Sequence, residues 1–175
     1  MYRRLLDLYK EYQASDMTRA QFLHEAGRLP GIYCPQLYET SYKEDGTIAA
    51  FTPLYDDVPA KIDKEIVTDL DAEAAVYPLA PVVPFIKVTQ DRVVLEIMRG
   101  CIRGCRFCQA GQLYRPLRER NVDELKEYAS AMLKNTGHEE ISLSSLSSSD
   151  YSKLPELIDY LIEECDRKKI NISLP

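Results

Sequence analysis

Three cysteines in one short segment constrain this chain more than any other feature of its sequence. Cys101, Cys105 and Cys108 are separated by three and then by two residues, and a glycine precedes each of the first two. Glycine inside a helix costs about 1 kcal/mol relative to alanine, so Gly100 and Gly104 favour a loop with unusual backbone angles over a helix with three buried cysteines on one face. Such a loop can hold a metal cluster and leave one ligand position open.

The number of cysteines in the segment leaves two kinds of metal site open. A 4Fe-4S cluster normally takes four thiolates, and a structural zinc site also needs four ligands. The other cysteines and histidines lie far away in the sequence, so a zinc site would have to recruit one of them by folding. We expect the two other cysteines to pack as small apolar side chains and the two histidines to have surface or capping roles. These residues are Cys34, Cys165, His24 and His138.

Length and charge limit the remaining possibilities. The 175 residues, 45% of them hydrophobic, are enough for one domain or one domain with an appendage. A net charge of -6 argues against a protein dedicated to nucleic acids or membrane surfaces. The sequence has no run of eighteen apolar residues and no secretory signal, and its five cysteines are an odd number for a disulfide framework. We therefore expect no membrane association and a cytoplasmic location, where thiols stay reduced.

The cysteine segment carries a local excess of positive charge. From Arg99 to Arg120 there are six arginines and one acid, Glu119, which gives a local balance of +5. Arginine can bind a carboxylate or a phosphate with two hydrogen bonds, so this excess indicates a site for an anionic group. A solvated basic face and a phosphate-bearing substrate such as RNA remain alternative interpretations.

In the first part of the chain, residues 1–90, the sequence pattern predicts helices, a hairpin and a connector. Apolar spacing indicates helices over residues 2–13 and 18–26, the second capped by Asp16 or Thr18. Residues 38–42 and 47–51 form a predicted hairpin with a glycine turn, and residues 61–67 a further strand. Three prolines within residues 77–84 indicate a semi-extended linker.

The second part, residues 91–175, alternates between strands and helices. Strands are predicted over residues 92–98, 140–143 and 170–174, with helices over residues 122–136, between Asn121 and Gly137, and 152–168, with Asp150 as its cap. This alternation is typical of a parallel α/β sheet, whose functional groups lie at the carboxyl ends of the strands. In the helix over residues 122–136, the residues predicted to face inward are Leu125, Ala129, Met132 and Leu133. In the helix over residues 152–168, they are Leu154, Leu157, Ile158, Leu161, Ile162 and Cys165.

The segment from Glu96 to Arg120, with Phe107 just before the last cysteine, resembles the signature loop of the radical S-adenosylmethionine (radical SAM) enzymes. Within that superfamily it is similar to a group of uncharacterised proteins associated with a cobalamin-binding domain. The resemblance implies that Cys101, Cys105 and Cys108 bind three irons of a 4Fe-4S cluster, while the amino and carboxylate groups of S-adenosylmethionine chelate the fourth. It also implies reductive cleavage of S-adenosylmethionine to a 5'-deoxyadenosyl radical. A non-catalytic iron-sulfur or zinc-binding module is the alternative function.

The resemblance extends to residues and partners outside the cysteines. Ser144 and Ser145 stand where many members have a Gly-Gly-Glu type motif that hydrogen-bonds the amino group of S-adenosylmethionine, although the acid is missing here. Together with Phe107 and Arg115 they are the candidate cofactor-binding residues. The implied partners are S-adenosylmethionine, an electron donor such as flavodoxin or ferredoxin, and an RNA or protein substrate.

The fold implied by the resemblance is a partial TIM barrel of about six βα units, of which this chain shows less than half. We therefore expect an α/β fold, the first part of a parallel (β/α) partial barrel, preceded by a mixed helix and hairpin connector. The chain is thus expected to be a fragment of a longer enzyme. Cobalamin would bind in a domain not visible here, since the sequence has no Asp-x-His-x-x-Gly motif and at most the last helices of that domain survive in residues 1–27.

Overall fold

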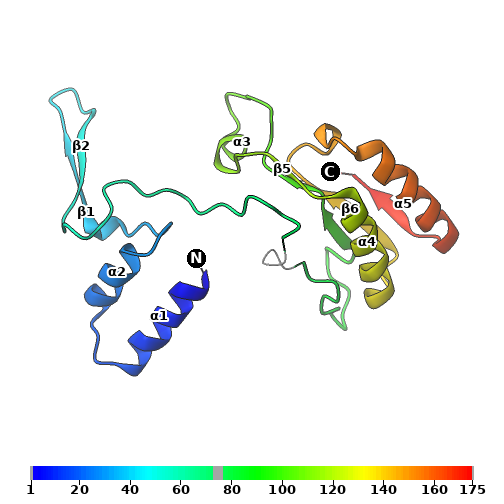
Figure 1. Cartoon of the computed structure of the whole chain (residues 1–175), viewed down its shortest axis with the longest axis horizontal. Coiled ribbons are helices and arrows are strands. Elements are labelled where there is room, and N and C mark those ends of the chain that lie inside the picture. The colour runs from blue at the N-terminus through cyan, green and yellow to red at the C-terminus, as the bar shows by residue number, and fades with distance from the viewer. Residues whose placement is uncertain (1, 73–76, 175) are drawn as a thin grey trace. The chain divides into compact units, whose positions relative to one another are not determined.

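The structure is a computed structural model that describes residues 2–72 and 77–174. It forms two compact units, Met1–Ile66 and Val67–Pro175, which Figure 1 colours along the chain. The domain boundary expected at residue 90 stays a prediction. The units divide earlier because the segment after Ile66 contacts the second unit: Arg118 Nη1 donates to the Val67 carbonyl at 2.8 Å, and the Tyr77 ring stacks on Tyr128 with ring centroids 5.0 Å apart.

The first unit contains two helices and a hairpin. Helix α1 spans Tyr2–Ala14 and α2 spans Arg19–Gly27, and both were predicted. Thr18 caps α2, since its hydroxyl accepts from the Gln21 N–H at 3.3 Å and the Gln21 side chain accepts from the Thr18 N–H at 2.8 Å. Strands β1 (Tyr38–Tyr42) and β2 (Ile48–Pro53) pair antiparallel, after a short 3-10 turn η1 (Pro35–Leu37). The core of this unit consists of Ala26, Cys34, Leu37, Tyr38 and Val58.

The prediction of a strand over residues 61–67 is wrong, because this segment has no regular secondary structure. Ile62 is its one residue that packs against the core of the first unit. Ile66 and Val67 are 38% and 48% exposed, so the segment has no apolar face to bury as a strand.

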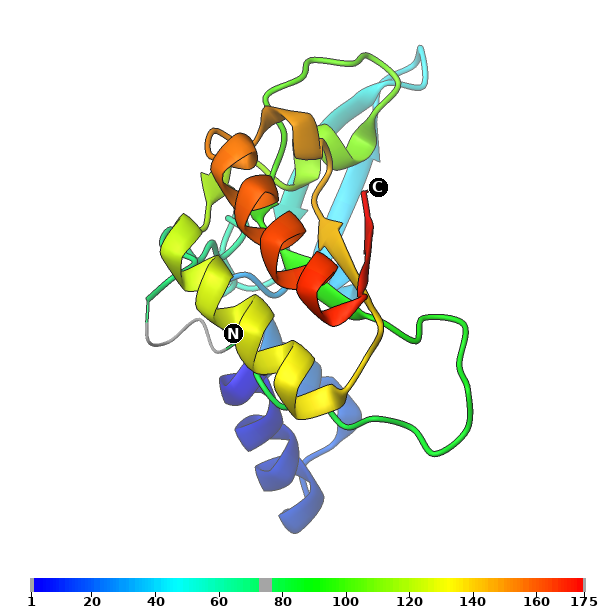
Figure 2. The ribbon, with the colours of Figure 1, turned by 90° about the vertical axis from the view of Figure 1, so that its right-hand side faces the viewer.

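The second unit is built on a parallel sheet of three strands. Strands β3 (Val93–Glu96), β6 (Glu140–Ser144) and β7 (Asn171–Ser173) lie in the order β3-β6-β7, and both pairings are parallel. Helices α4 (Val122–Thr136) and α5 (Leu154–Lys168) lie side by side and pack on these strands (Figures 1 and 2). The predicted α/β class with a parallel sheet is confirmed, while the partial barrel stays a prediction.

The core of the second unit lies between the sheet and these two helices. Alternate strand residues point into it, among them Leu95 and Ile141, which are both fully buried. The four inward residues predicted for α4 are buried, and Leu157, Leu161 and Cys165 of α5 are buried as well. Ile162 was predicted to face inward but is 54% exposed, because one residue beyond Leu161 the helix has already turned by about 100°.

Helices α4 and α5 differ in how well their ends were predicted. Helix α4 has the predicted bounds, since the Asn121 side chain accepts from the Asp123 N–H at 2.8 Å and Gly137 ends the helix in the left-handed conformation at φ 70°. The predicted cap of α5 is wrong. Lys153 occupies the cap position, and Asp150 lies in a 3-10 turn, η2 (Ser148–Asp150), where it pairs with a side chain from the cysteine segment.

The strand predicted over residues 92–98 is interrupted at Ile97. Beyond it, β4 (Met98–Arg99) pairs antiparallel with β5 (Arg118–Glu119). The Ile97 N–H donates to the Ser144 carbonyl at 3.1 Å, and the Ile97 carbonyl accepts from the Arg120 N–H at 3.0 Å. Ile97 therefore joins the parallel sheet to a two-stranded ribbon at the base of the cysteine segment. Of the helices in the described part of the chain, none is long and apolar enough to cross a bilayer.

Candidate functional site

The base of the cysteine loop requires a glycine at one of its two expected positions. Gly100 has a φ of 97°, and a Cβ there would lie 2.7 Å from the Pro116 carbonyl oxygen and 2.8 Å from that of Tyr114. Gly104 does not have a positive φ, and a Cβ there would meet no described atom within 4 Å. The expectation of unusual backbone angles is therefore confirmed at Gly100 and wrong at Gly104.

The three thiols of the loop have different surroundings. Cys101 is buried, Cys108 is half-buried and Cys105 is exposed. The Arg103 N–H donates to Cys101 Sγ at 3.3 Å, and the Gly111 N–H donates to Cys108 Sγ at 3.4 Å, at the start of the short helix α3 (Gln109–Leu113). Backbone N–H groups that point at sulfur stabilise thiolates and tune iron-sulfur clusters, so these two cysteines have surroundings suited to metal ligands.

The structure does not bring the three thiols together into a formed metal site. In residues 2–72 and 77–174, no group of three or more histidine, cysteine, aspartate or glutamate residues is placed to hold a metal ion. The donor set still fits a cluster by its chemistry, because three soft sulfur donors lie on one loop and two of them receive backbone hydrogen bonds.

Two residues that could have supplied the fourth ligand of a zinc site, Cys165 and His138, lie elsewhere in the second unit. Cys165 is 1% exposed in the core, and burial raises the pKa of its thiol. His138 precedes β6, at the sheet edge opposite to the one where the cysteine loop follows β3, and its Nδ1 lies 3.3 Å from Asp91 Oδ1. In the first unit, Cys34 is buried and His24 Nε2 lies 2.9 Å from Asp57 Oδ1. Both left-over cysteines are thus buried, as expected.

A cavity of about 270 Å³ lies at the carboxyl ends of β3 and β6. The structure brings Ser144 and Ser145 to this cavity together with Gly100, the residue before the first cysteine. Phe107 is 92% exposed, and Arg115 Nε donates to the Gly111 carbonyl at 3.1 Å; neither of them lines the cavity. The lining consists of Glu96, Met98, Arg99, Gly100, Tyr114, Ser144, Ser145 and Leu146.

Glu96 is a charged residue of the cavity that was not among the predicted site residues. Arg99 binds both of its carboxylate oxygens, with Nε to Oε1 at 2.8 Å and Nη2 to Oε2 at 2.7 Å, and Arg120 Nη2 lies 3.4 Å from Oε2. Burial alone would raise the pKa of Glu96, but the hydrogen bonds and charges of the two arginines outweigh it and hold this pKa below its ordinary value. An acid at the end of a predicted strand, three residues before an arginine, was the signal that could have revealed it.

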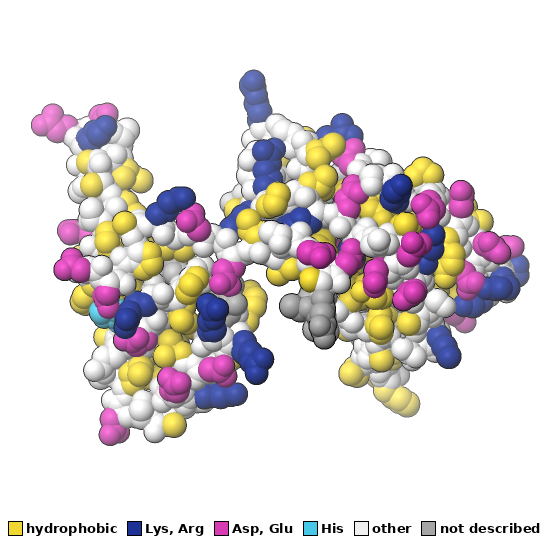
Figure 3. Space-filling model, in the orientation of Figure 1, with side chains coloured by type: hydrophobic (Ala, Val, Ile, Leu, Met, Phe, Trp, Pro, Cys, Tyr) yellow, Lys and Arg dark blue, Asp and Glu magenta, His cyan; other side chains and the backbone are white. Residues whose placement is uncertain are grey.

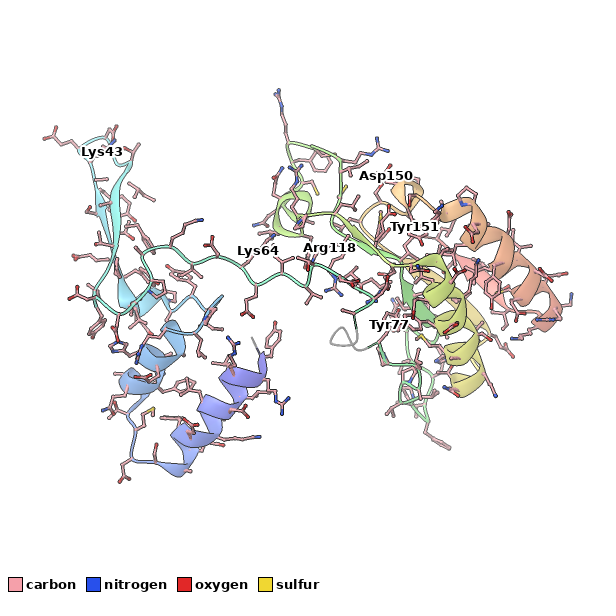
Figure 4. All side chains as sticks on the ribbon, in the orientation of Figure 1. Lys43, Lys64, Tyr77, Arg118, Asp150 and Tyr151 are labelled. Atoms are coloured by element: carbon pink, nitrogen blue, oxygen red, sulfur yellow. The ribbon has the colours of Figure 1, made fainter. Side chains whose placement is uncertain are left out.

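Most of the arginines in the segment bind groups of the protein itself. Arg103 donates to both carboxylate oxygens of Asp150. Arg118, which Figure 4 labels, donates to the carbonyls of Val67, Pro116 and Tyr114. Arg120 is 4% exposed; it donates to the Leu70 carbonyl and lies 4.8 Å above the Tyr77 ring. Figure 3 shows that basic side chains also gather on the surface around α3. The charge excess thus serves chiefly to fix the loop, and Arg99 is the arginine that lines the cavity.

Comparison with known proteins assigns the second unit to a class. Residues 95–175 match the sequence model of the family described as Radical SAM superfamily, so a radical SAM superfamily domain occupies the part that holds the cysteine loop and the parallel sheet. Members of this family typically use a 4Fe-4S cluster and S-adenosylmethionine.

One relative is an archaeal protein. Over 68 residues the chain is 40% identical to "Uncharacterized protein MJ0966" of Methanocaldococcus jannaschii, and the aligned part covers 39% of this chain and 15% of that protein. The chain therefore spans a small part of the length of this relative. No solved structure matches the chain.

Proposed function

We propose that this chain carries the cluster-binding and S-adenosylmethionine-binding part of a radical SAM enzyme. Cys101, Cys105 and Cys108 would hold three irons of a 4Fe-4S cluster. When bound, the cluster and S-adenosylmethionine supply a one-electron reductive cleavage that yields a 5'-deoxyadenosyl radical. The observation that supports this proposal best is the position of the cysteine loop, whose base at Gly100 lines the same cavity as Ser144 and Ser145 at the carboxyl edge of the sheet.

The residues of the chain would position the ligands of this site. Gly100 allows the base of the loop to lie against the backbone at Pro116, and the N–H groups of Arg103 and Gly111 support two thiolates. The hydroxyls of Ser144 and Ser145 would offer hydrogen bonds to polar groups of a ligand in the cavity. Cofactor contacts of Phe107 and Arg115 stay predictions.

The wider assignments also remain proposals. A partial barrel would need further parallel strands beside the three described here. The association with cobalamin rests on the sequence resemblance alone, and so do the electron donor of flavodoxin or ferredoxin type and the RNA or protein substrate. We propose the chain as the first part of such a catalytic core.

Anaerobic reconstitution with iron and sulfide tests the proposed function. We expect about four irons per chain, broad visible absorbance, and an EPR signal of the reduced protein that changes when S-adenosylmethionine is added. The variant Cys105→Ala should lose the cluster, whereas Cys34→Ala, which removes a thiol from the first unit, should keep it. Stoichiometric zinc with no response to S-adenosylmethionine would instead support the non-catalytic module and overturn the proposal.

A further inference from the structure

Arg118 holds a positive charge at the base of the cysteine loop and binds only backbone carbonyls in the described part of the chain. We propose that this charge raises the reduction potential of a cluster on the loop, because it favours the form that carries one more electron. The same side chain fixes the end of the loop through its hydrogen bonds. This role rests on the proposed function and makes Arg118 a positioning residue of that site.

The guanidinium of Arg118 joins two segments of the second unit. Its Nε donates to the Pro116 carbonyl at 3.0 Å and its Nη2 to the Tyr114 carbonyl at 3.2 Å, both at the end of the cysteine loop. Its Nη1 donates to the Val67 carbonyl at 2.8 Å, in the segment that precedes β3. One side chain therefore ties the returning arm of the loop to a segment far away in the sequence.

The carbonyls that Arg118 binds also border the start of the loop. A Cβ on Gly100 would lie 2.7 Å from the Pro116 carbonyl oxygen and 2.8 Å from that of Tyr114. Cys101 directly follows Gly100 and is buried. The positive charge of Arg118 is therefore held on the oxygens that lie against the residue before the first thiol.

The neighbouring arginines at the base of the loop are matched by acids. Arg99 pairs with Glu96 at 2.7 Å, and Arg120 lies 3.4 Å from the same carboxylate and 3.5 Å from that of Asp71. Three arginines thus meet two acids, which leaves one positive charge. Among the described residues, Arg118 is the arginine of the three that forms no ion pair, so the excess charge is assigned to it.

The surroundings of Arg118 strengthen the effect of its charge. The side chain is half-buried, and burial, followed by the charge of Arg99, lowers the pKa of Arg118 although Glu96 acts in the opposite direction. An arginine keeps its proton at neutral pH even when its pKa is lowered. Because a partly buried charge is less screened by water, it acts more strongly on charges nearby.

A fixed positive charge and hydrogen bonds to sulfur are two separate influences on a cluster. One-electron reduction adds a negative charge to a 4Fe-4S cluster, and its potential depends on nearby charge and on hydrogen bonds to its sulfurs. The N–H groups of Arg103 and Gly111 supply such hydrogen bonds to Cys101 and Cys108. Arg118 supplies the charge, which stabilises the reduced form more than the oxidised one.

The test measures the midpoint potential of the reconstituted full chain at an electrode, without S-adenosylmethionine. Arg118→Gln removes the charge, Arg118→Lys keeps it, and the control Arg167→Gln removes an exposed arginine from the last turn of α5, ahead of β7. We expect Arg118→Gln to disfavour reduction about tenfold, which is about 59 mV for one electron. Arg118→Lys and the control should keep the potential of the wild type.

Iron loss from the same proteins separates the charge from the structural role. Lysine cannot bind three carbonyls as the guanidinium fork does, so both Arg118 variants should lose iron faster than the wild type. A purely structural role predicts that their potentials also change alike, and that result would overturn the proposal.

A second pair of variants keeps the test valid if Arg118→Gln does not fold. Val67 is 48% exposed and binds Arg118 through its carbonyl alone, so Val67→Glu adds an acid near the guanidinium and leaves its hydrogen bonds in place. We expect Val67→Glu to lower the potential and the matched Val67→Gln to leave it unchanged. If the wild type loads a cluster but neither Arg118→Gln nor Val67→Glu lowers its potential, the charge role is wrong while the proposed function stands. If the wild type loads no cluster, the proposed function itself fails and the role of Arg118 with it.

Discussion

Arg103 donates hydrogen bonds to both carboxylate oxygens of Asp150, with Nε to Oδ2 at 2.8 Å. This pair connects the cysteine loop after β3 to the turn after β6, across 47 residues of sequence. Asp150 does not cap α5, because it lies in η2 and Lys153 occupies the cap position. The two loops that border the cavity are therefore joined by a charged contact outside the sheet.

Replacement of Asp150 by asparagine should loosen the cysteine loop. The variant loses the charge that holds Arg103, so we expect faster tryptic cleavage after Arg106 and faster loss of iron from the reconstituted protein. The matched control is Asp166→Asn on the exposed side of α5, which should behave like the wild type. Equal cleavage rates in all three proteins would contradict this role.

The same pair predicts the pH dependence of the loop. Hydrogen bonds from Arg103 and Ser147 lower the pKa of Asp150, so the pair stabilises the loop throughout the neutral range. Since the folded-state pKa is lowered, this contribution is present above the ordinary aspartate pKa of about 4 and is lost as the pH falls further, through the lowered value. The Arg103 Nε–H resonance of the cluster-free chain should therefore change below about pH 4, and this change should be absent in Asp150→Asn.

Gly100 and Gly104 form a matched pair for a stability test. Gly100→Ala should destabilise the fold by about 1–3 kcal/mol, because alanine is strained at this φ and its Cβ would collide with the carbonyl of Pro116. Gly104→Ala should be neutral or stabilise by about 0.4–1 kcal/mol, since it restricts the unfolded chain and meets no described atom. Urea unfolding followed by circular dichroism gives both values. Similar losses in the two variants would show that the loop conformation is wrong.

Leu161 and Ile162 test the orientation of α5. Leu161→Ala should cost about 2–5 kcal/mol, because the side chain is fully buried between helix and sheet. Ile162→Ala should change the free energy of unfolding by about 0.5 kcal/mol or less, since more than half of that side chain is exposed. The same urea experiment measures both, and a larger loss at Ile162 would mean that the helix is rotated.

Tyr151 should make the protein sensitive to alkaline pH. Its hydroxyl donates to the Arg120 carbonyl at 2.9 Å, and burial, followed by neighbouring acids, raises its pKa to about 12. Because the pKa of Tyr151 is raised in the folded state, its hydrogen bond stabilises the fold fully below about pH 10, where the unfolded side chain begins to ionise. This stabilisation is lost as the pH rises from there toward the pKa of the folded state. Tyr151→Phe should cost about 1 kcal/mol at neutral pH, and this difference from the wild type should shrink as the pH rises above about 10. A constant difference across that range would rule out Tyr151 as the cause.

The parts of the fold that depend on neighbouring residues in the sequence could be predicted from it. The bounds of α4 were predicted from Asn121 and Gly137, because a cap and a stop act within one turn of the helix. The parallel sheet followed from the alternation of strands and helices. The interruption at Ile97 could not be predicted, since it depends on hydrogen bonds to Ser144 and Arg120, which lie further along the chain.

The candidate site was predictable in part. The cysteine spacing and Gly100 indicated the loop, and the position after a strand placed Ser144 and Ser145 at the correct sheet edge. From the sequence, the arginines are visible only as a total charge, whereas their effect depends on which acid each one contacts in the folded chain. For that reason Glu96, which Arg99 and Arg120 bind, was not among the predicted site residues.

The pairing of β4 with β5 has a consequence for the segment that carries the three thiols. Arg99 and Arg118 are direct partners, so strand pairing closes the polypeptide ring that contains all three thiols. Closing a ring of this length is the entropic part of building a metal site, and here backbone hydrogen bonds bear that cost. Zinc fingers, by contrast, stay unfolded until metal joins their ends. If the loop holds the proposed cluster, the ring around it is therefore closed by strand pairing and not by the metal.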